Sequence, residues 1–244
     1  MQINLYASAS ALLLILTTTF SSCKKDDSFE GSGSASIELE HVWNEDDFSL
    51  NKAFTTDSNQ QATFTTLKYI VSNFVFVNEN GAQYTIKDSC YLIDISAPAS
   101  TLLPFSNIPS GNYKSVHFWV GVDSTHNVSG NISGLSSMYQ NASNGYTFMK
   151  AEGSSPQSGS GFLYHISGYQ APNAAQRAIT IDFGSSSLQV RQSKKAQLHT
   201  SVNVEKLFTG INISTLPQIN TAGADALKMA DNYATLFSFE HIHN

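Results

Sequence analysis

The histidines are the side chains of this sequence most suited to metal chemistry, because neutral imidazole is a common ligand for copper and zinc. The last two, His241 and His243, are two residues apart. In a strand, such residues point to the same face and lie close enough to chelate one ion. The alternative is an exposed C-terminus that holds nothing, and the spacing alone favours neither. The others are His41, His117, His126, His165 and His199.

His41 is a further candidate ligand. It lies on a predicted strand at 36–43, on the same face as Trp43. If the first and last strands of the domain are neighbours, His41 could meet His241 and His243; otherwise it is a half-exposed strand residue. We expect His117 to be a structural histidine, and His126 and His199 to be surface residues.

Asp123 and Asn127 follow the end of a predicted strand in a loop. Their oxygen atoms could bind calcium, but the spacing is not that of an EF-hand. We favour the alternative, in which Asp123 caps a turn through its side chain.

Cys23 carries the clearest signal for location. It follows an apolar stretch at 11–20 and two serines, and a charged run begins directly after it. This pattern is typical of a bacterial lipoprotein signal, and the apolar stretch is shorter than a membrane-spanning helix. We expect residues 1–22 to be a cleaved signal peptide and 23–35 a lipidated (palmitate-carrying) cysteine with a flexible tether. An ordinary cleaved signal is the alternative. The expected location is the outer membrane, on its periplasmic or its surface face.

Composition limits the other functions. The net charge is −6, only 13% of residues are charged, and no basic cluster is present, so we expect no nucleic-acid partner. No motif of a hydrolase, metalloprotease or phosphate-binding loop occurs, so we do not expect an enzyme. Cys90 is the second of two cysteines, and its apolar surroundings predict a buried, inert thiol.

Alternation of apolar and polar residues predicts an all-β domain over 36–244. Many short strands with turns between them favour an antiparallel β-sandwich or an open barrel. A helix is expected at 222–233 and a helical turn at 204–208, both near the C-terminus. The expected strands are 36–43, 64–77, 83–86, 90–95, 115–122, 146–152, 162–167, 177–183, 197–204 and 236–242.

Several segments, in this order and spacing, resemble the copper-binding MbnP-like family of exported bacterial proteins. The resemblance spans roughly 36–243 and implies a β-sandwich that handles copper outside the cytoplasm. It also implies a di-haem partner protein, which oxidises a tryptophan that then helps to bind copper. The segments are KYIVSN at 68–73, GVDSTHN at 121–127, GYTFMKAEG at 145–153 and YHISGY at 164–169.

The last of these segments contains His165, which makes it a candidate ligand; its alternative is a strand histidine hydrogen-bonded to a loop. Many family members carry a Trp-x-Trp segment where this chain has MYQNA at 138–142, and its only tryptophans are Trp43 and Trp119. The chain thus departs from the family's modified-tryptophan site. Because a lipid on Cys23 would leave Cys90 as the other cysteine, a copper site here would consist mainly of histidine.

Two functional hypotheses follow. The first is an envelope-anchored lipoprotein that binds or acquires copper. The second is a β-sandwich module that binds a carbohydrate or a protein without metal. An exposed Trp43, or several exposed tyrosines among Tyr139, Tyr146 and Tyr169, would mark the groove of such a module.

Overall fold

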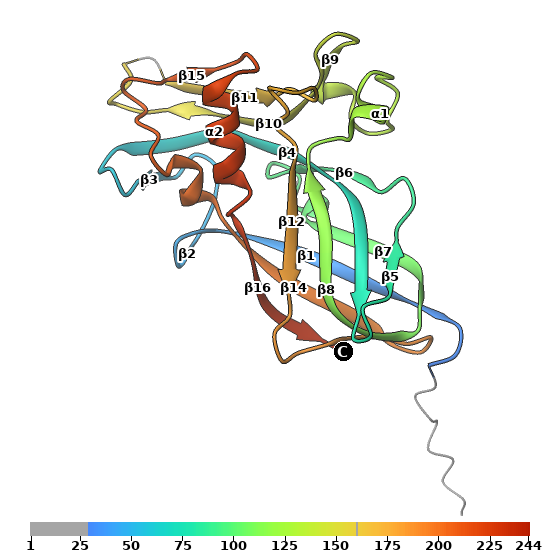
Figure 1. The fold of residues 1–244 in the computed structure, drawn as a ribbon. Helices are drawn as coiled ribbons and strands as arrows, with labels where there is room; N and C mark the ends of the chain where they lie inside the picture. The colour runs from blue at the N-terminus through green and yellow to red at the C-terminus, as the bar shows by residue number, and fades with distance from the viewer. Residues whose placement is uncertain (1–28, 160) are drawn as a thin grey trace, which may run out of the picture.

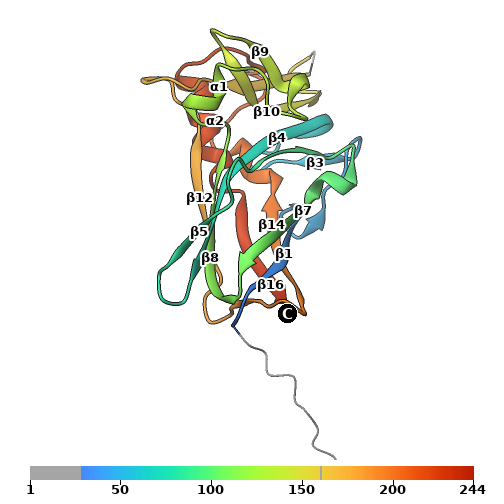
Figure 2. The same cartoon turned by 90° about the vertical axis from the view of Figure 1, so that its right-hand side faces the viewer.

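The structure is a computed structural model that describes residues 29–159 and 161–244. The predicted signal peptide and the lipidated Cys23 lie outside the described residues. Two sheets make up the fold, joined by turns and short helices (Figures 1 and 2).

The smaller sheet has five strands in the order β16-β14-β1-β2, with β7 also paired to β1. Neighbours within it are antiparallel except β1 and β14, which are parallel. Its strands are β1 (Ser32–Trp43), β2 (Asp46–Asp47), β7 (Leu102–Pro109), β14 (Lys195–Asn203) and β16 (Phe237–His243).

The larger sheet has eleven strands, and its central path runs β12-β8-β4-β10-β11-β15. The long strand β4 passes from the upper to the lower half of Figure 1 and pairs with five of the other ten strands of this sheet. The strands are β3 (Ala53–Thr55), β4 (Gln61–Asn78), β5 (Gln83–Thr85), β6 (Cys90–Asp94), β8 (Gly111–Val120), β9 (Tyr139–Asn141), β10 (Gly145–Ser154), β11 (Phe162–Ser167), β12 (Arg177–Asp182), β13 (Leu188–Val190) and β15 (Gln218–Ile219).

Helices are few and short. They are α1 (Ser124–Asn127), α2 (Ala224–Tyr233) and the 3-10 turns η1 (Pro98–Thr101), η2 (Ser136–Met138) and η3 (Val204–Phe208). α2 buries Met229, Ala230 and Tyr233 against the upper half of the domain. Within the described residues, none of these helices has the length and hydropathy needed to span a bilayer.

Aromatic side chains fill the space between the two sheets. Phe237 of β16 contacts Phe118 of β8, with ring centroids 5.2 Å apart, and Tyr69 of β4 at 6.0 Å. Phe105 of β7 contacts Phe74 of β4 at 5.0 Å. Such rings bury a large apolar area and prefer tilted or edge-to-face contacts. The inner faces of both sheets therefore form one core, as in a sandwich.

The predicted all-β fold with a helix near the C-terminus is confirmed. The predicted helix at 222–233 corresponds to α2, and the predicted turn at 204–208 to η3. Several details differ from the prediction. The strands β2, β3, β7, β9, β13 and β15 were not predicted. β1 begins at Ser32, within the segment predicted to be a tether, and the β1–β14 and β11–β15 pairs are parallel.

Candidate metal centre

The outer face of the smaller sheet is built by the alternation of β14. Ala196, Leu198 and Thr200 are buried in the core, so the residues between them, Gln197 and His199, point outward. β1 is the parallel neighbour of β14, and its residue Glu38 pairs with His199.

β1 presents two carboxylates on the same outer face. Ile37 and Leu39 are buried, so Glu38 and Glu40 point outward beside His199. One imidazole and two carboxylates from two strands thus share one place on the sheet.

β16 brings two more histidines through a β-bulge. Thr200 of β14 pairs with Phe239, but the preceding residue His199 pairs with His241, so Glu240 is an extra residue in β16. The bulge reverses the alternation: Phe239 packs against the core, whereas His241 and His243 lie on the outer face. Residues opposite each other in an antiparallel pair share a face, so His241 stands beside His199.

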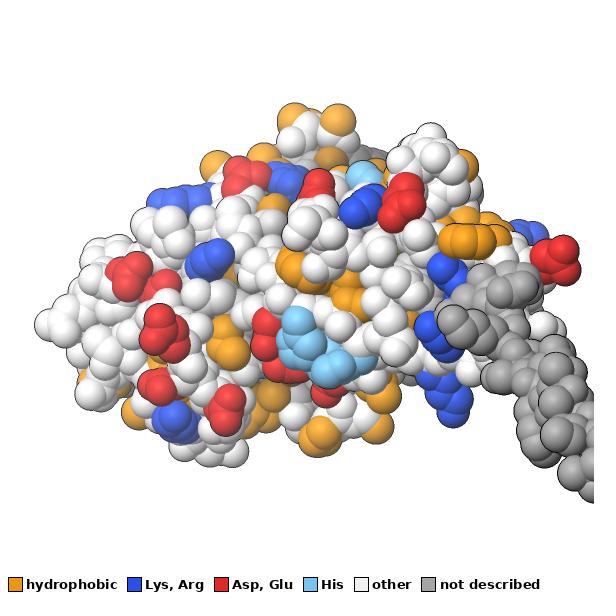
Figure 3. Space-filling view, turned by 90° about the horizontal axis from the view of Figure 1, so that it is seen from below, with side chains coloured by type: hydrophobic (Ala, Val, Ile, Leu, Met, Phe, Trp, Pro, Cys, Tyr) orange, Lys and Arg blue, Asp and Glu red, His pale blue; other side chains and the backbone are white. Residues whose placement is uncertain are grey.

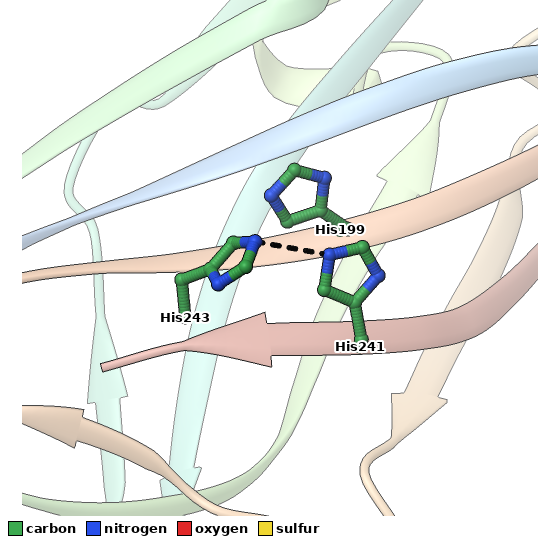
Figure 4. A group of neighbouring side chains, drawn as sticks. All are labelled: His199, His241 and His243. Carbon is green, nitrogen blue, oxygen red and sulfur yellow. Dashed lines mark hydrogen bonds between the residues drawn. The ribbon is translucent and has the colours of Figure 1, made fainter.

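The three imidazole rings meet on this face (Figures 3 and 4). The Nε2 atoms of His241 and His243 are 3.2 Å apart. The rings of His199 and His241 are stacked, with centroids 4.1 Å apart and planes 12° apart, and the ring of His243 stands edge-on to both. One nitrogen from each histidine lies within 4.8 Å of the other two. We call these three residues the histidine cluster.

The two carboxylates of β1 orient His199. Its Nδ1 atom lies 2.5 Å from Oε1 of Glu40 and 3.5 Å from Oε2 of Glu38, and Gln197 donates a hydrogen bond to Glu38. An Nδ1–H that donates to Glu40 leaves the lone pair on Nε2, which is how second-shell carboxylates prepare a histidine for a metal. That Nε2 atom is covered and has no hydrogen-bond partner among the described residues.

A second carboxylate contact supports His241. Its Nδ1 atom is 3.5 Å from Oε1 of Glu240, the bulge residue. The side chain of His241 is 44% exposed, whereas that of His199 is 12% exposed. The cluster therefore has one covered ligand and an open side toward solvent.

The spacing suits a small metal ion. At a metal–nitrogen distance of about 2.0 Å, two ligand atoms are about 2.8 Å apart at a right angle and about 3.3 Å apart in a tetrahedron, and the 3.2 Å between His241 and His243 lies within this range. Three imidazole nitrogens with an open side form a donor set for copper or zinc. The residues present thus fit the metal that the family resemblance implies.

Two other predicted ligands lie elsewhere. His165 on β11 pairs with Glu152 of β10, with Nε2 and Oε1 2.6 Å apart, and this hydrogen bond lowers the pKa of the Glu152 carboxyl. Thr66 also donates to Glu152. His165 belongs to no group of three potential metal ligands among the described residues. Its hydrogen bond goes to the neighbouring strand β10, and not to a loop as the non-metal alternative had it.

His41 does not reach the histidine cluster. β14 lies between β1 and β16, and His41 points to the opposite face of β1 from Glu40. Its Nε2 atom is 2.8 Å from the hydroxyl of Tyr69, which is fully buried. The predicted meeting of His41 with the C-terminal pair is therefore wrong, because the neighbour of the last strand is β14 and not β1.

Asp123 and Asn127 have structural roles. Oδ1 of Asp123 accepts from the backbone amides of Thr125 and His126, and so caps α1. Burial alone would raise the pKa of Asp123, but hydrogen bonds from His126 hold it below its usual value. Asn127 is buried, donates to the Val122 carbonyl and accepts from the Tyr146 amide. The favoured turn-capping role of Asp123 agrees with these contacts, and nothing at this loop supports calcium.

The remaining predictions concern Cys90 and the aromatic groove. Burial raises the pKa of the Cys90 thiol to about 12, as expected for an inert cysteine. Trp43 and Tyr146 are buried, so they do not mark an exposed groove, while Tyr139 and Tyr169 are partly exposed.

His199 is the cluster member that sequence reasoning missed, since it was expected to be a surface residue. The alternation of the strand was the available signal. Every second residue of this strand faces the core, which places His199 on the outer face; the core-facing residues are Ala196, Leu198, Thr200 and Val202. The pairing of β14 with β16 could not be predicted from the sequence.

Comparisons with known proteins agree with the fold. The family model described as MbnP matches residues 32–222. Among solved structures, MbnP from Methylosinus trichosporium matches with a TM-score of 0.54 and 13% sequence identity, covering 79% of this chain and 83% of that chain. No curated protein sequence matches. At this identity the structural likeness shows the fold alone.

Proposed function

This chain belongs to the MbnP family, and we propose that its domain binds one copper ion at the histidine cluster. The observation that carries the proposal is the convergence of three imidazoles around a covered nitrogen. That nitrogen, Nε2 of His199, has no other partner among the described residues, and Glu40 holds the ring in the matching tautomer.

Copper is the ion that the family resemblance and general coordination chemistry favour together. Among divalent first-row metals, copper binds a given nitrogen site most tightly, followed by nickel and zinc. The proposed role is copper binding or acquisition at the cell envelope, with the domain anchored to the outer membrane through a lipid on Cys23. We propose a binding protein and not an enzyme; the di-haem partner implied by the resemblance stays a prediction.

The test is a copper titration of the purified mature protein. The variants are His199→Gln and the double variant His241→Ala/His243→Ala, with His165→Ala and His126→Ala as matched controls outside the cluster. We expect one copper per chain in the unaltered protein and in both controls. Loss of ligands should weaken binding by more than the 10–100-fold that second-shell changes cost. Unchanged stoichiometry and affinity in both cluster variants would refute the proposal.

A second candidate function is suggested by a polar hollow of about 320 Å³ in the upper half of the domain. It lies between the turn after β9, the loop after β11 and the segment before α2. Neutral amides and one aromatic ring line it, which suits a polyhydroxylated ligand such as a saccharide. The residues that would bind it are Gln140, Asn144, Tyr169, Gln170, Asn173 and Asn220.

Calorimetric titration with a panel of neutral oligosaccharides tests this second function. Tyr169→Ala should abolish any binding that the unaltered protein shows, because its ring is the aromatic surface of the hollow on which a sugar ring would stack. Tyr84→Ala, which lies outside the hollow, should leave it unchanged. Equal binding by both variants, or no binding to any sugar, would count against a saccharide site here.

A further inference from the structure

We propose that the carboxylates around the histidine cluster make it a site for Cu(II) in preference to Cu(I). This inference rests on the proposed function and adds the oxidation state of the ion. The residues that set it are Glu38 and Glu40 of β1, with Glu240 on the other side of the cluster.

The donor set is the first argument. Cu(I) is held best by soft thiolate and thioether sulfur, whereas Cu(II) takes nitrogen and oxygen in tetragonal geometry. The described methionines, Met138, Met149 and Met229, are buried in the core, and Cys90 lies on β6 of the other sheet. The cluster offers imidazole nitrogen, and carboxylate oxygen is the next donor available.

Charge is the second argument. Oxygen atoms of Glu40 and Glu38 lie 2.5 and 3.5 Å from Nδ1 of His199, and an oxygen of Glu240 lies 3.5 Å from Nδ1 of His241. Cu(II) carries one more positive charge than Cu(I), so three nearby anions attract it more strongly. The side chains of Glu38 and Glu40 are only 37% and 39% exposed, so water screens their charges incompletely.

The hydrogen bond to His199 is the third argument. A carboxylate that accepts from Nδ1–H raises the basicity of the ring and makes Nε2 a stronger donor to the ion. A stronger donor favours the higher oxidation state. Glu40 is thus a positioning residue that also tunes the metal through His199, and Glu38 adds charge beside it.

The experiment compares the affinities for the two oxidation states in the mature protein. Dissociation constants for Cu(II) and for Cu(I), the latter under anaerobic reduction, are measured by competition with chelators. Reduction potentials are measured on the loaded protein. The variants are Glu40→Gln, Glu38→Gln and the double variant, and Glu45→Gln, an exposed carboxylate outside the cluster, is the matched control.

We expect the unaltered protein to bind Cu(II) more tightly than Cu(I). The double variant should lose at least about tenfold of that preference, which for a one-electron couple raises the potential by about 59 mV. Glu40→Asp keeps a carboxylate, so it should lose less of the preference for Cu(II) than Glu40→Gln does. Glu45→Gln should leave this preference unchanged. The electron paramagnetic resonance spectrum of bound Cu(II) should show hyperfine coupling to nitrogen in the unaltered protein and in every variant. This coupling reports that the histidine ligands remain.

Two results would overturn this inference while the proposed function stands: tighter binding of Cu(I), or an unchanged affinity ratio in the double variant. Failure to bind either ion would refute the proposed function and this inference with it. The outcomes are distinguishable because the affinities for each ion are measured separately.

Discussion

His41 lies one residue beyond Glu40 on β1 but faces the core, where it shares a hydrogen bond with Tyr69. Desolvation by burial lowers the pKa of its imidazole from 6.5 to about 4. The unfolded chain then binds a proton at a higher pH than the folded protein. The contribution of neutral His41 to the free energy of unfolding is therefore fully present above about pH 6.5, and it is lost as the pH falls toward 4.

The first prediction follows from this linkage. Between pH 7.5 and 4.5 the unaltered protein should lose about 2–3 kcal/mol of unfolding free energy through His41 alone, at about 1.4 kcal/mol for each pKa unit. The glutamine in His41→Gln cannot be protonated. Between pH 7.5 and 4.5 the unfolding free energy of this variant should therefore fall by about 2–3 kcal/mol less than that of the unaltered protein. Urea unfolding at both pH values measures the difference. His117→Gln, at a partly exposed histidine whose ring contacts the hydroxyls of Ser115 and Thr180, should behave like the unaltered protein. An equal fall in the His41 variant would contradict the prediction.

The two-residue spacing of His241 and His243 predicts that they share a face of the strand, and their Nε2 atoms lie 3.2 Å apart; that they chelate a metal stays a prediction. The sequence also placed His41 on one face with Trp43, which is buried. It could not place His41 relative to the C-terminal pair, because that depends on strand order. His199 was within reach of the same alternation argument, yet its role depends on a neighbour about 40 residues further along the chain.

The bulge in β16 is the element that assembles the cluster. Phe237, Phe239, His241 and His243 are all two residues apart, so a regular strand would place all four on one face. Instead the phenylalanines pack inward and the histidines lie outside, because Glu240 is inserted between them. The sequence indicates this bulge only through Ile242. This apolar residue lies an odd number of positions after the two phenylalanines, so a regular strand would place it on the opposite face from them.

The second prediction tests the bulge. Deleting one residue from a strand ordinarily turns all later side chains to the other face. Deleting Glu240 should instead convert the bulged strand into a regular one, with His241 and His243 still outside. We expect a stability change within about 1 kcal/mol and retained copper binding. Deleting Ser238, by contrast, would turn Phe239 out of the core, and the loss should reach about 2–4 kcal/mol.

Chemical unfolding and copper titration of the two deletion variants measure this contrast, and Glu240→Ala serves as the control that keeps the strand length. Loss of copper binding on deletion of Glu240, with binding retained in Glu240→Ala, would show that the bulge geometry itself is required. That result would contradict the prediction.

At the scale of the whole molecule, composition and alternation were enough to predict an all-β domain, because a half-buried strand needs apolar residues at every second position. They were not enough to predict the parallel pairing of β1 with β14. The paired residues Glu38 and His199 are separated by most of the domain, and no local pattern encodes so distant a contact. The candidate metal centre lies across this pairing, so sequence reasoning did not identify its carboxylates.

The third prediction concerns the proposed lipid anchor at Cys23. Cys23→Ser should move the protein from the membrane to the soluble fraction and abolish palmitate labelling, because several acyl chains on Cys23 would supply the stable anchor. Copper affinity and unfolding free energy should stay unchanged, since the domain begins beyond the anchor. Cys90→Ser is the matched control: the only other cysteine has a pKa raised to about 12 and should not be acylated. Membrane-bound, labelled Cys23→Ser protein would refute the anchor, as would loss of label in Cys90→Ser.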